Sequence, residues 1–266
     1  MSQSIETTRP VVLTIAGFDP SCGAGIAADL KTISACGAYG IAAITALTIQ
    51  NTVGVNRVIP IEPLVLIQQI EYLIEDIRPA AVKIGMLATK ENVEGLRKFL
   101  LSNPLSRIVI DPVIRSSSGS ALLTDEAIDV FKTAILPLAD CLTPNISEAE
   151  ILSGLKVRNV DEMKKAAERI VALGSKAVVI TGGHLIEPTD VLFDGATYEI
   201  FAAERVGPSH THGTGCTFSS ALATFLALGC SLKTATANAK NYVTRAIQRS
   251  YPIGRGRSPL NHFPDY

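Results

Sequence analysis

Short apolar runs alternate along this chain with longer segments in which apolar residues recur at helical spacing. Such runs are typical of buried strands, and the longer segments are typical of amphipathic helices. We predict strands at residues 11–16, 41–46, 81–84, 107–110, 141–143 and 177–181, and helices at residues 26–36, 63–74, 90–101, 124–136 and 160–173. Thr124 is expected to cap its helix, and Gly174 to end the helix before it.

The pattern changes after Gly183. Residues 191–193 and 196–201 flank Asp194-Gly195, which predicts a tight antiparallel hairpin, and two helices at 213–228 and 232–249 follow. Strands alternating with helices indicate a mostly parallel sheet covered on both faces. We therefore expect an α/β fold, a three-layer sandwich in one domain (residues 1–266) with antiparallel strands near the C-terminal edge. Residues 1–10 are expected to be flexible and residues 251–266 to form a tail.

Composition narrows the functional classes. The 266 residues are 47% hydrophobic, carry a formal net charge of −1 and contain no Trp, which disfavours a nucleic-acid binder. No apolar stretch reaches the length of a membrane span, and the first ten residues do not resemble a signal peptide. Five scattered cysteines without a C-x-x-C pair favour reduced thiols. We expect a cytoplasmic protein that acts on small molecules.

The strongest chemical signal lies where the penultimate helix begins, in the sequence His212-Gly213-Thr214-Gly215-Cys216. Two glycines at a helix N-terminus let the backbone N–H groups approach an anion closely. A cysteine in the first helical turn is expected to shift toward thiolate and could act as a base. The alternative is a small buried cysteine packed under a turn.

A second glycine-bearing loop, residues 17–25, follows the first strand. It matches neither the P-loop nor the dinucleotide-binding pattern. Asp29 is expected in the first turn of the next helix, either as a ligand contact or as a carboxylate that favours the helix dipole.

Carboxylates follow two further strands. Asn145 and Glu148 stand at a strand end and helix start, where they could hold water around Mg²⁺ or simply form a capping box. Asp111, before Pro112, could supply a second carboxylate to the same ion or could only end its strand in an Asp-Pro turn. Both interpretations remain open at this point.

Several segments together match motifs of a known family. They are LTIAGFDPSCGAGIAADLKTISACGAYG, ITALTIQNT, KIGML, DPV, LTPNISEAEIL, VVITGGH and THGTGCTFSSA, which lie between about residues 12 and 240. By these the chain resembles the ribokinase-like kinases, and among them the hydroxymethylpyrimidine/phosphomethylpyrimidine kinases of thiamine biosynthesis. The resemblance implies a ribokinase-like fold and ATP-dependent phosphorylation of 4-amino-5-hydroxymethyl-2-methylpyrimidine and of its monophosphate.

The resemblance also implies site residues. The catalytic group would be Cys216 with Gly213, Thr214 and Gly215; the substrate pocket Gly17, Ala24, Asp29, Thr48, Gln50, Met86 and Cys216; the nucleotide side Asn145, Thr181, Gly183, Thr211 and Lys240; and the metal site Asp111 and Glu148, through water. Gln50 would read the ring, because its amide can donate to a ring nitrogen and accept from an exocyclic amine. Cys216 would accept the hydroxymethyl proton during in-line phosphoryl transfer.

The implied cofactors are ATP and Mg²⁺, with a K⁺ requirement left open, and the implied assembly is a homodimer that binds neither nucleic acid nor membrane. A pyridoxal or pyridoxine kinase of the same fold is the main alternative, and a non-catalytic ligand sensor is another. A sugar kinase is disfavoured because Gln50 and Cys216 stand where a polyol kinase has aspartate-based, polar-rich chemistry.

The chain departs from the family pattern in two loops. Phe18 and Cys22 stand where a smaller polar residue and a glycine are usual, and Ser117 and Ser120 stand where Lys and Asp are common. We expect Arg115 to replace the missing cation, so that reversing its charge weakens the affinity for ATP and for the monophosphate.

Overall fold

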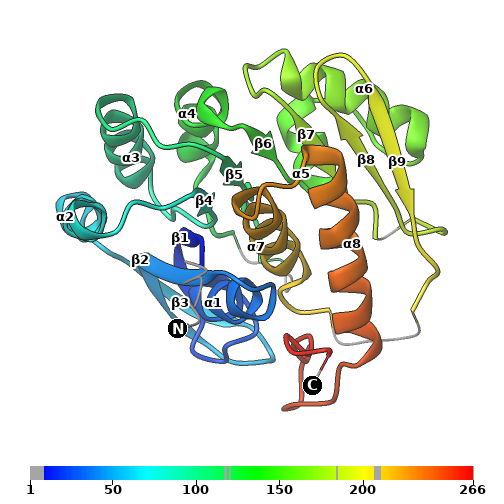
Figure 1. Ribbon diagram of the computed structural model, residues 1–266, viewed down its shortest axis with the longest axis horizontal. Helices are drawn as coiled ribbons and strands as arrows, with labels where there is room; N and C mark the ends of the chain where they lie inside the picture. Colours follow the sequence, from blue (N-terminus) through cyan, green and yellow to red (C-terminus); the bar gives the residue numbers. More distant parts are fainter. Residues whose placement is uncertain (1–8, 117–118, 120, 184, 207–210, 266) are drawn as a thin grey trace, which may run out of the picture.

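A computed structural model describes residues 9–116, 119, 121–183, 185–206 and 211–265. Nine strands form one sheet in the order β3-β2-β1-β4-β5-β6-β7-β8-β9 (Figure 1). The strands are β1 (Val11–Phe18), β2 (Tyr39–Gln50), β3 (Val55–Pro60), β4 (Ala81–Ile84), β5 (Ile108–Ile110), β6 (Cys141–Leu142), β7 (Val178–Ile180), β8 (Thr189–Phe193) and β9 (Tyr198–Ala202). The pairs from β2 to β7 are parallel, and β8 and β9 are antiparallel, as expected.

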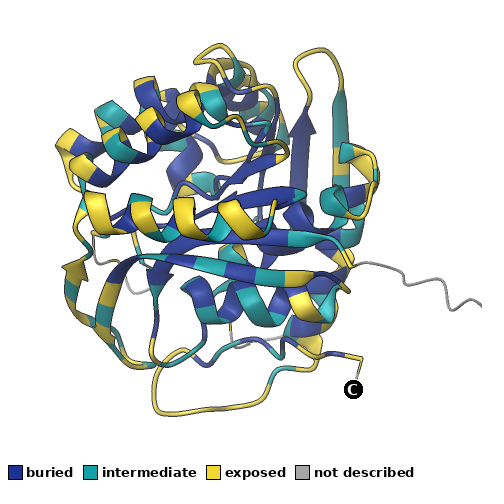
Figure 2. Ribbon diagram, turned by 60° about the vertical axis from the view of Figure 1, so that its left-hand side comes forward, coloured by how far each residue is buried: buried dark blue, intermediate teal, exposed yellow. Residues whose placement is uncertain are grey.

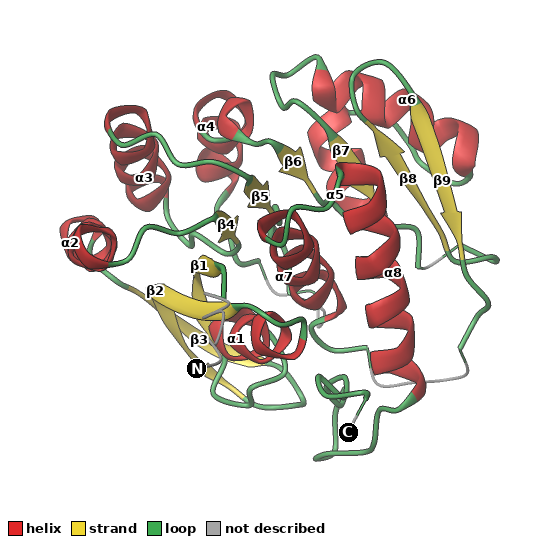
Figure 3. Ribbon diagram, in the orientation of Figure 1, coloured by secondary structure: helices red, strands yellow, loops and turns green. Residues whose placement is uncertain are grey.

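Helices cover both faces of the sheet (Figure 3). They are α1 (Gly25–Ala35), α2 (Pro63–Asp76), α3 (Lys90–Ser102), α4 (Asp125–Ala134), α5 (Ile146–Ser153), α6 (Val160–Val171), α7 (Thr214–Ala227) and α8 (Leu232–Gln248), with the short 3-10 helix η1 (Leu136–Leu138). The predicted three-layer sandwich is confirmed. Thr124 caps α4 as expected, because its side chain accepts a hydrogen bond from the backbone N–H of Ala127.

The two hydrophobic cores follow from the alternation of side chains along the strands. Leu13 and Ile15 of β1 face the core formed with α2 to α6, whereas Val12 faces the core formed with α1, α7 and α8. Neighbouring strands repeat this division; Val109 of β5, for example, lies in the same core as Val12. Figure 2 shows the strands as a buried layer between half-exposed helices. The central strands are therefore apolar on both faces, which is why their sequences read as continuous apolar runs.

The edge of the sheet beside β2 differs from the prediction. β2 extends to Gln50, well beyond residue 46, and β3 pairs with it as an antiparallel strand that the sequence pattern did not indicate. β3 is mostly exposed and its residues lack a buried apolar run, so no strong periodic signal marks it. Antiparallel strands thus occur at both edges.

A buried ion pair lies between β4 and α1. Lys83 Nζ is 2.8 and 3.0 Å from the two carboxylate oxygens of Asp29, and both side chains are fully buried. Asp29 also accepts hydrogen bonds from Thr14 and Ser220, at 2.6 and 2.7 Å. Burial acts to lower the pKa of Lys83, but the facing Asp29 carboxylate raises it above its ordinary value.

This placement corrects the expectation for Asp29. The first turn of α1 contains no acidic residue, and the Asp29 carboxylate is surrounded by Lys83 and hydroxyl donors inside the protein. Its physical role is to neutralise a buried lysine and to tie α1 to α7; its contact with a substrate stays a prediction.

The tail is packed against the domain. Leu260 and His262 are buried, and the Tyr242 hydroxyl donates a 2.6 Å hydrogen bond to the His262 carbonyl. The Ser258 carbonyl accepts from the backbone N–H of His212 at 3.3 Å. The tail therefore supports the loop that precedes α7.

Replacing Lys83 by Met should lower the free energy of unfolding by about 3–5 kcal/mol, because it leaves the Asp29 charge buried and unpaired. The double variant Lys83→Met/Asp29→Asn should recover part of this loss. Lys233→Met is the matched control, since its pair with Glu199 is largely exposed, and it should cost less than about 1 kcal/mol. Urea denaturation measures all three, and equal stability of Lys83→Met and the control contradicts the assignment.

Candidate functional site

The site lies at the carboxyl ends of the parallel strands, where the loops after β1, β5 and β6 meet the start of α7. The loop of residues 17–25 crosses directly over the N-terminus of α7. A Cβ on Gly213 would stand 1.8 Å from the Gly23 carbonyl oxygen, and Gly213 has a φ of 84°. Gly25, with a φ of 56°, would bring a Cβ 2.2 Å from the Gly17 carbonyl oxygen. Only glycine fits at these two positions.

The N-terminus of α7 is capped by the backbone of Gly213, without a side-chain cap. The helix dipole and the first backbone N–H groups are thus oriented toward the loops of the site, an arrangement that suits an anion. Thr211 is exposed, and its carbonyl accepts hydrogen bonds from the backbone N–H and the hydroxyl of Thr214. Gly215 lies against Asp111, whose carboxylate oxygens would be 3.6 and 3.7 Å from a Cβ there.

The thiol of Cys216 is enclosed by polar and charged groups. Its sulfur accepts a hydrogen bond from the backbone N–H of Gly25, and the thiol donates to Asp111. Burial raises the pKa of Cys216 to about 12, even though the ammonium of Lys83 acts to lower it. The predicted shift toward thiolate is wrong for the protein without ligands, because desolvation outweighs the helix terminus and the nearby cation.

Two buried carboxylates, Asp111 and Glu148, lie close enough for their charges to interact, and Asp111 also contacts Cys216. Burial raises the pKa of Asp111 to about 6 and that of Glu148 to about 8, and the charge of Asp111 adds to the shift of Glu148. Asn145 caps α5 in a complete capping box: its side chain accepts from the Glu148 N–H at 3.0 Å, and Glu148 accepts from the Asn145 N–H at 2.9 Å. The structural interpretation of this pair is therefore correct, and it leaves room for a second role.

The residues present fit a divalent cation held mainly by water and phosphate oxygens. A cation between Asp111 and Glu148 would offset the burial that raises both pKa values, and the repulsion that Asp111 adds at Glu148. Within the described part of the chain, no three His, Cys, Asp or Glu side chains come together as a metal cluster. Two carboxylates with water are a typical protein contribution to a Mg²⁺ site.

Of the residues expected on the nucleotide side, Asn145, Thr181 and Gly183 follow β6 and β7, Thr211 precedes α7 and Lys240 lies in α8. Asn145 and Thr181 pair as an isolated parallel bridge, and a Cβ at Gly183 would meet open space. Lys240 Nζ lies 2.9 Å from Asp190, and both side chains are nearly buried. Lys240 thus neutralises an internal carboxylate that also accepts from the Gly182 N–H, which the sequence did not indicate.

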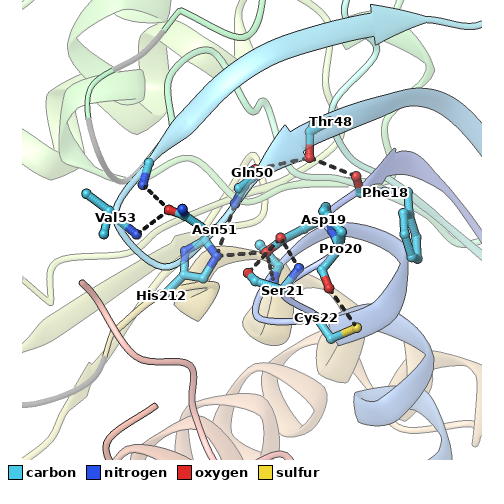
Figure 4. A network of polar contacts seen from close by, with 12 residues as sticks. Phe18, Asp19, Pro20, Ser21, Cys22, Thr48, Gln50, Asn51, Val53 and His212 are labelled. Atoms are coloured by element: carbon cyan, nitrogen blue, oxygen red, sulfur yellow. Dashed lines mark hydrogen bonds and ion pairs between the residues drawn. The ribbon is translucent and has the colours of Figure 1, made fainter. Parts of the chain in front are cut away.

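The residues expected around the substrate approach one another between β1 and β2. A Cβ at Gly17 would lie 3.1 Å from the Met86 sulfur. The Thr48 hydroxyl donates to the Phe18 carbonyl at 2.9 Å and lies 3.3 Å from Gln50 Oε1. Figure 4 shows Gln50 at the end of β2, beside His212 and the loop that carries Asp19.

Several residues of the site were not identified from the sequence. Asp19 and His212 form a 2.8 Å contact across 193 positions, and Ala24 donates its backbone N–H to the same Asp19 carboxylate at 3.0 Å. Lys83 is the cation whose charge acts to lower the pKa of Cys216. Asp19, His212 and Lys83 all lie in the motifs quoted above, but nothing in the local sequence indicates their partners.

The departures from the family pattern have different outcomes. Cys22 has a φ of 58°, a backbone region that favours glycine, which explains why glycine is usual there. Arg115 is exposed and pairs in an isolated bridge with Ala121; its proposed contact with phosphate stays a prediction. Ser117 and Ser120 lie outside the described residues.

This geometry suits the transfer of an anionic group to an alcohol. The N-terminus of α7 supplies aligned N–H donors, Cys216 lies in its first turn, and two buried carboxylates can attract a cation. All five cysteines are free. No helix in the described part of the chain is long and apolar enough to cross a bilayer.

Comparison with known proteins agrees with this geometry. A family model described as phosphomethylpyrimidine kinase matches residues 19–261. A hydroxymethylpyrimidine/phosphomethylpyrimidine kinase of Bacillus subtilis is 42% identical over 94% of this chain and 94% of its own length. The thiamine biosynthesis bifunctional protein ThiED of Geobacter sulfurreducens is 43% identical over 96% of this chain, which spans about half (52%) of that longer protein.

Solved structures show the same fold. The ADP complex of Bacillus subtilis pyridoxal kinase has a TM-score of 0.88 and 38% identity, covering 96% of this chain and 97% of the other. A phosphomethylpyrimidine kinase of Clostridium difficile has a TM-score of 0.80 and 43% identity, covering 90% and 99%. Because the family match includes most of the loops that build the site, this chain belongs to the phosphomethylpyrimidine kinase family.

Proposed function

We propose that this protein is a kinase of thiamine biosynthesis that transfers a phosphoryl group from ATP to 4-amino-5-hydroxymethyl-2-methylpyrimidine and then to its monophosphate. The observation that carries the proposal is the position of Cys216 at the glycine-capped start of α7, between Asp111 and the Gly25 N–H. The membership of the family and the ADP complex of a relative support ATP as the donor. Reduced thiols support a cytoplasmic location.

The residues divide into three groups in this proposal. Gln50 reads the pyrimidine, with Gly17, Ala24, Thr48 and Met86 around the ring. Asn145, Thr181, Gly183, Thr211 and Lys240 lie toward the nucleotide, and Lys240 acts there through Asp190. Asp111 and Glu148 would hold Mg²⁺, largely through water, and the ion would supply neutralisation of phosphate charge.

The protein's own part in the reaction is to position groups and to stabilise charge. The N–H groups from Gly213 to Cys216 stabilise charge on the transferring group. Cys216 accepts the hydroxymethyl proton, which requires that its own thiol proton be removed first, since burial raises the pKa of the thiol to about 12. That proton is lost to solvent as the pH rises, because Asp111, with a pKa of about 6 and a place beside the cation, is too weak a base to keep it.

Replacing Cys216 by Ala should lower the rate of pyrimidine phosphorylation by about 10²–10⁴-fold. The wild-type rate should rise with pH through the neutral and alkaline range, because a thiol with a pKa of about 12 gains its base form only as the pH increases. The variant should lack this rise. Cys230→Ala is the control, and steady-state kinetics from pH 6 to 10 is the measurement. Undiminished activity of Cys216→Ala would show that Cys216 is not the base.

A pyridoxal kinase is the second candidate, because a structure at 38% identity is described as one. A competition assay in which ATP consumption is measured with the hydroxymethylpyrimidine and pyridoxal, singly and together, separates the two functions. We expect the higher kcat/KM for the pyrimidine, whose ring nitrogen and amine match the Gln50 amide. A higher kcat/KM for pyridoxal would instead identify the protein as a pyridoxal kinase. A non-catalytic sensor is disfavoured by the joint presence of Cys216, Asp111 and Glu148.

The homodimer is proposed to form through the outer face of β2 and β3. Leu47 pairs with Ile59 across these strands, and Ile49 follows on the same face. Their exposed fractions are 42%, 38% and 50%. Adjacent exposed apolar side chains on one sheet face are typical of an interface.

Ile49→Glu should therefore shift the protein toward monomer, because a charge would be buried between subunits. Leu64→Glu on α2 is the control, since Leu64 is also exposed, at 67%, but lies outside this face. Sedimentation velocity measures the association state. Dissociation by the control but not by Ile49→Glu places the interface elsewhere.

A further inference from the structure

His212 connects the loop of residues 17–25 to the ring-reading residue Gln50. Its Nε2 atom is 2.8 Å from Asp19 Oδ2 and 3.3 Å from the terminal amide of Gln50 (Figure 4). One ring nitrogen thus lies within hydrogen-bonding distance of two side chains. Whether it carries a proton decides what it offers to Gln50.

Asp19 determines that proton. Its Oδ1 accepts from the Ser21 N–H and hydroxyl, at 2.8 and 2.7 Å, and its Oδ2 accepts from the Ala24 N–H at 3.0 Å. Burial acts to raise the pKa of Asp19, but these donors and His212 together hold it below its ordinary value. An ionised carboxylate only accepts hydrogen bonds. The proton therefore resides on His212 Nε2, which is a donor.

Proton counting then fixes the Gln50 amide. The two orientations of an amide have nearly the same shape, and its hydrogen-bond partners decide between them. In the structure the amide NH₂ of Gln50 faces His212 Nε2, and the amide oxygen faces the Thr48 hydroxyl. The one proton on Nε2 is donated to Asp19, which leaves no lone pair on Nε2 to accept from that NH₂. The partners therefore favour the flipped amide, with its oxygen toward His212. The Thr48 hydroxyl has one proton, which it donates to the Phe18 carbonyl at 2.9 Å. Its oxygen is free to accept from the amide NH₂ on the other side of Gln50.

His212 itself is held in place from several sides. A Cβ on Gly23 would stand 2.3 Å from His212 Cδ2, so the ring packs directly on the glycine loop. Its backbone N–H donates to Ser258, and it forms an isolated bridge with Pro259 of the tail. A ring fixed in this way can hold the amide in one orientation.

We propose that Asp19, acting through His212, is a positioning device that locks the polarity of the Gln50 amide and thereby selects 4-aminopyrimidines over 4-oxopyrimidines. The proposal rests on the proposed function, in which Gln50 contacts the ring. A 4-aminopyrimidine offers a ring nitrogen that accepts and an amine that donates, whereas the 4-oxo form offers the reverse pattern. An amide fixed in one orientation pairs with only one of them, and a freely rotating amide pairs with both.

The test compares kcat/KM for the 4-amino substrate with kcat/KM for its 4-oxo analogue, 5-hydroxymethyl-2-methylpyrimidin-4(3H)-one. The wild-type ratio should favour the amino compound by about 100-fold or more, and His212→Leu should lower this ratio at least about tenfold, mainly through KM. A merely structural role would slow both substrates equally. A folded His212→Leu protein with the wild-type ratio overturns the proposal.

Asp19→Asn tests the second step, because a neutral amide no longer requires the proton on Nε2. Its ratio should fall as well, and Ser21→Ala, which removes one hydroxyl contact to Asp19 without changing charge, should keep the wild-type ratio. If His212→Leu lowers the ratio but Asp19→Asn does not, the role of Asp19 is wrong and His212 acts alone.

A measurement on the wild-type protein decides the case if either variant fails to fold. The ¹⁵N chemical shift of His212 Nε2 distinguishes a nitrogen that bears a proton from one with a free lone pair. We expect a proton on Nε2, because Nε2 faces the Asp19 carboxylate at 2.8 Å, and a lone pair on Nε2 overturns the lock. If the wild-type protein phosphorylates neither pyrimidine, the proposed function fails, while the NMR result still decides the lock itself.

Discussion

The close crossing of two backbone segments underlies the whole site. The carbonyl of Gly23 occupies the space that a side chain on Gly213 would fill, so the loop after β1 can lie directly on the N-terminus of α7. This contact brings the Gly25 N–H to the Cys216 sulfur, the Gly23 backbone to the His212 ring and the Asp19 carboxylate to His212. A side chain at Gly213 or Gly23 would push the loop of residues 17–25 away from the Cys216 thiol.

Below this crossing, charge is balanced inside the protein. Lys83 and Asp29 form a pair without solvent exposure, and the Lys83 ammonium acts on both Cys216 and Asp111. The resulting field is not sufficient to ionise the thiol, because desolvation is the larger effect. The site without ligands thus combines a thiol and two carboxylates whose pKa values are all raised. A cation that binds together with phosphate would stabilise the charged carboxylates.

The residues proposed for catalysis and those proposed for substrate choice lie on different sides of this crossing. Cys216, Asp111 and Glu148 lie on the side of β5 and β6, whereas Gln50, His212 and Asp19 lie on the side of β2. Residues 211–216 link the two groups, since His212 belongs to one and Cys216 to the other. If the proposed roles hold, substitutions in one group can alter substrate choice without changing the residues that handle the proton.

The sequence alone determined the alternation of strands and helices, the parallel core of the sheet and the C-terminal hairpin, because burial on both faces imposes continuous apolar runs and helical periodicity. It also indicated Cys216, the glycines around it and the capping box of Asn145 and Glu148, since these depend on neighbours a few positions apart. Tertiary structure alone decided that Asp29 pairs with Lys83, that Lys240 pairs with Asp190, that burial raises the pKa of Cys216, and that β3 completes one edge. These features depend on partners distant in the chain and on desolvation, and a local sequence pattern encodes neither of them.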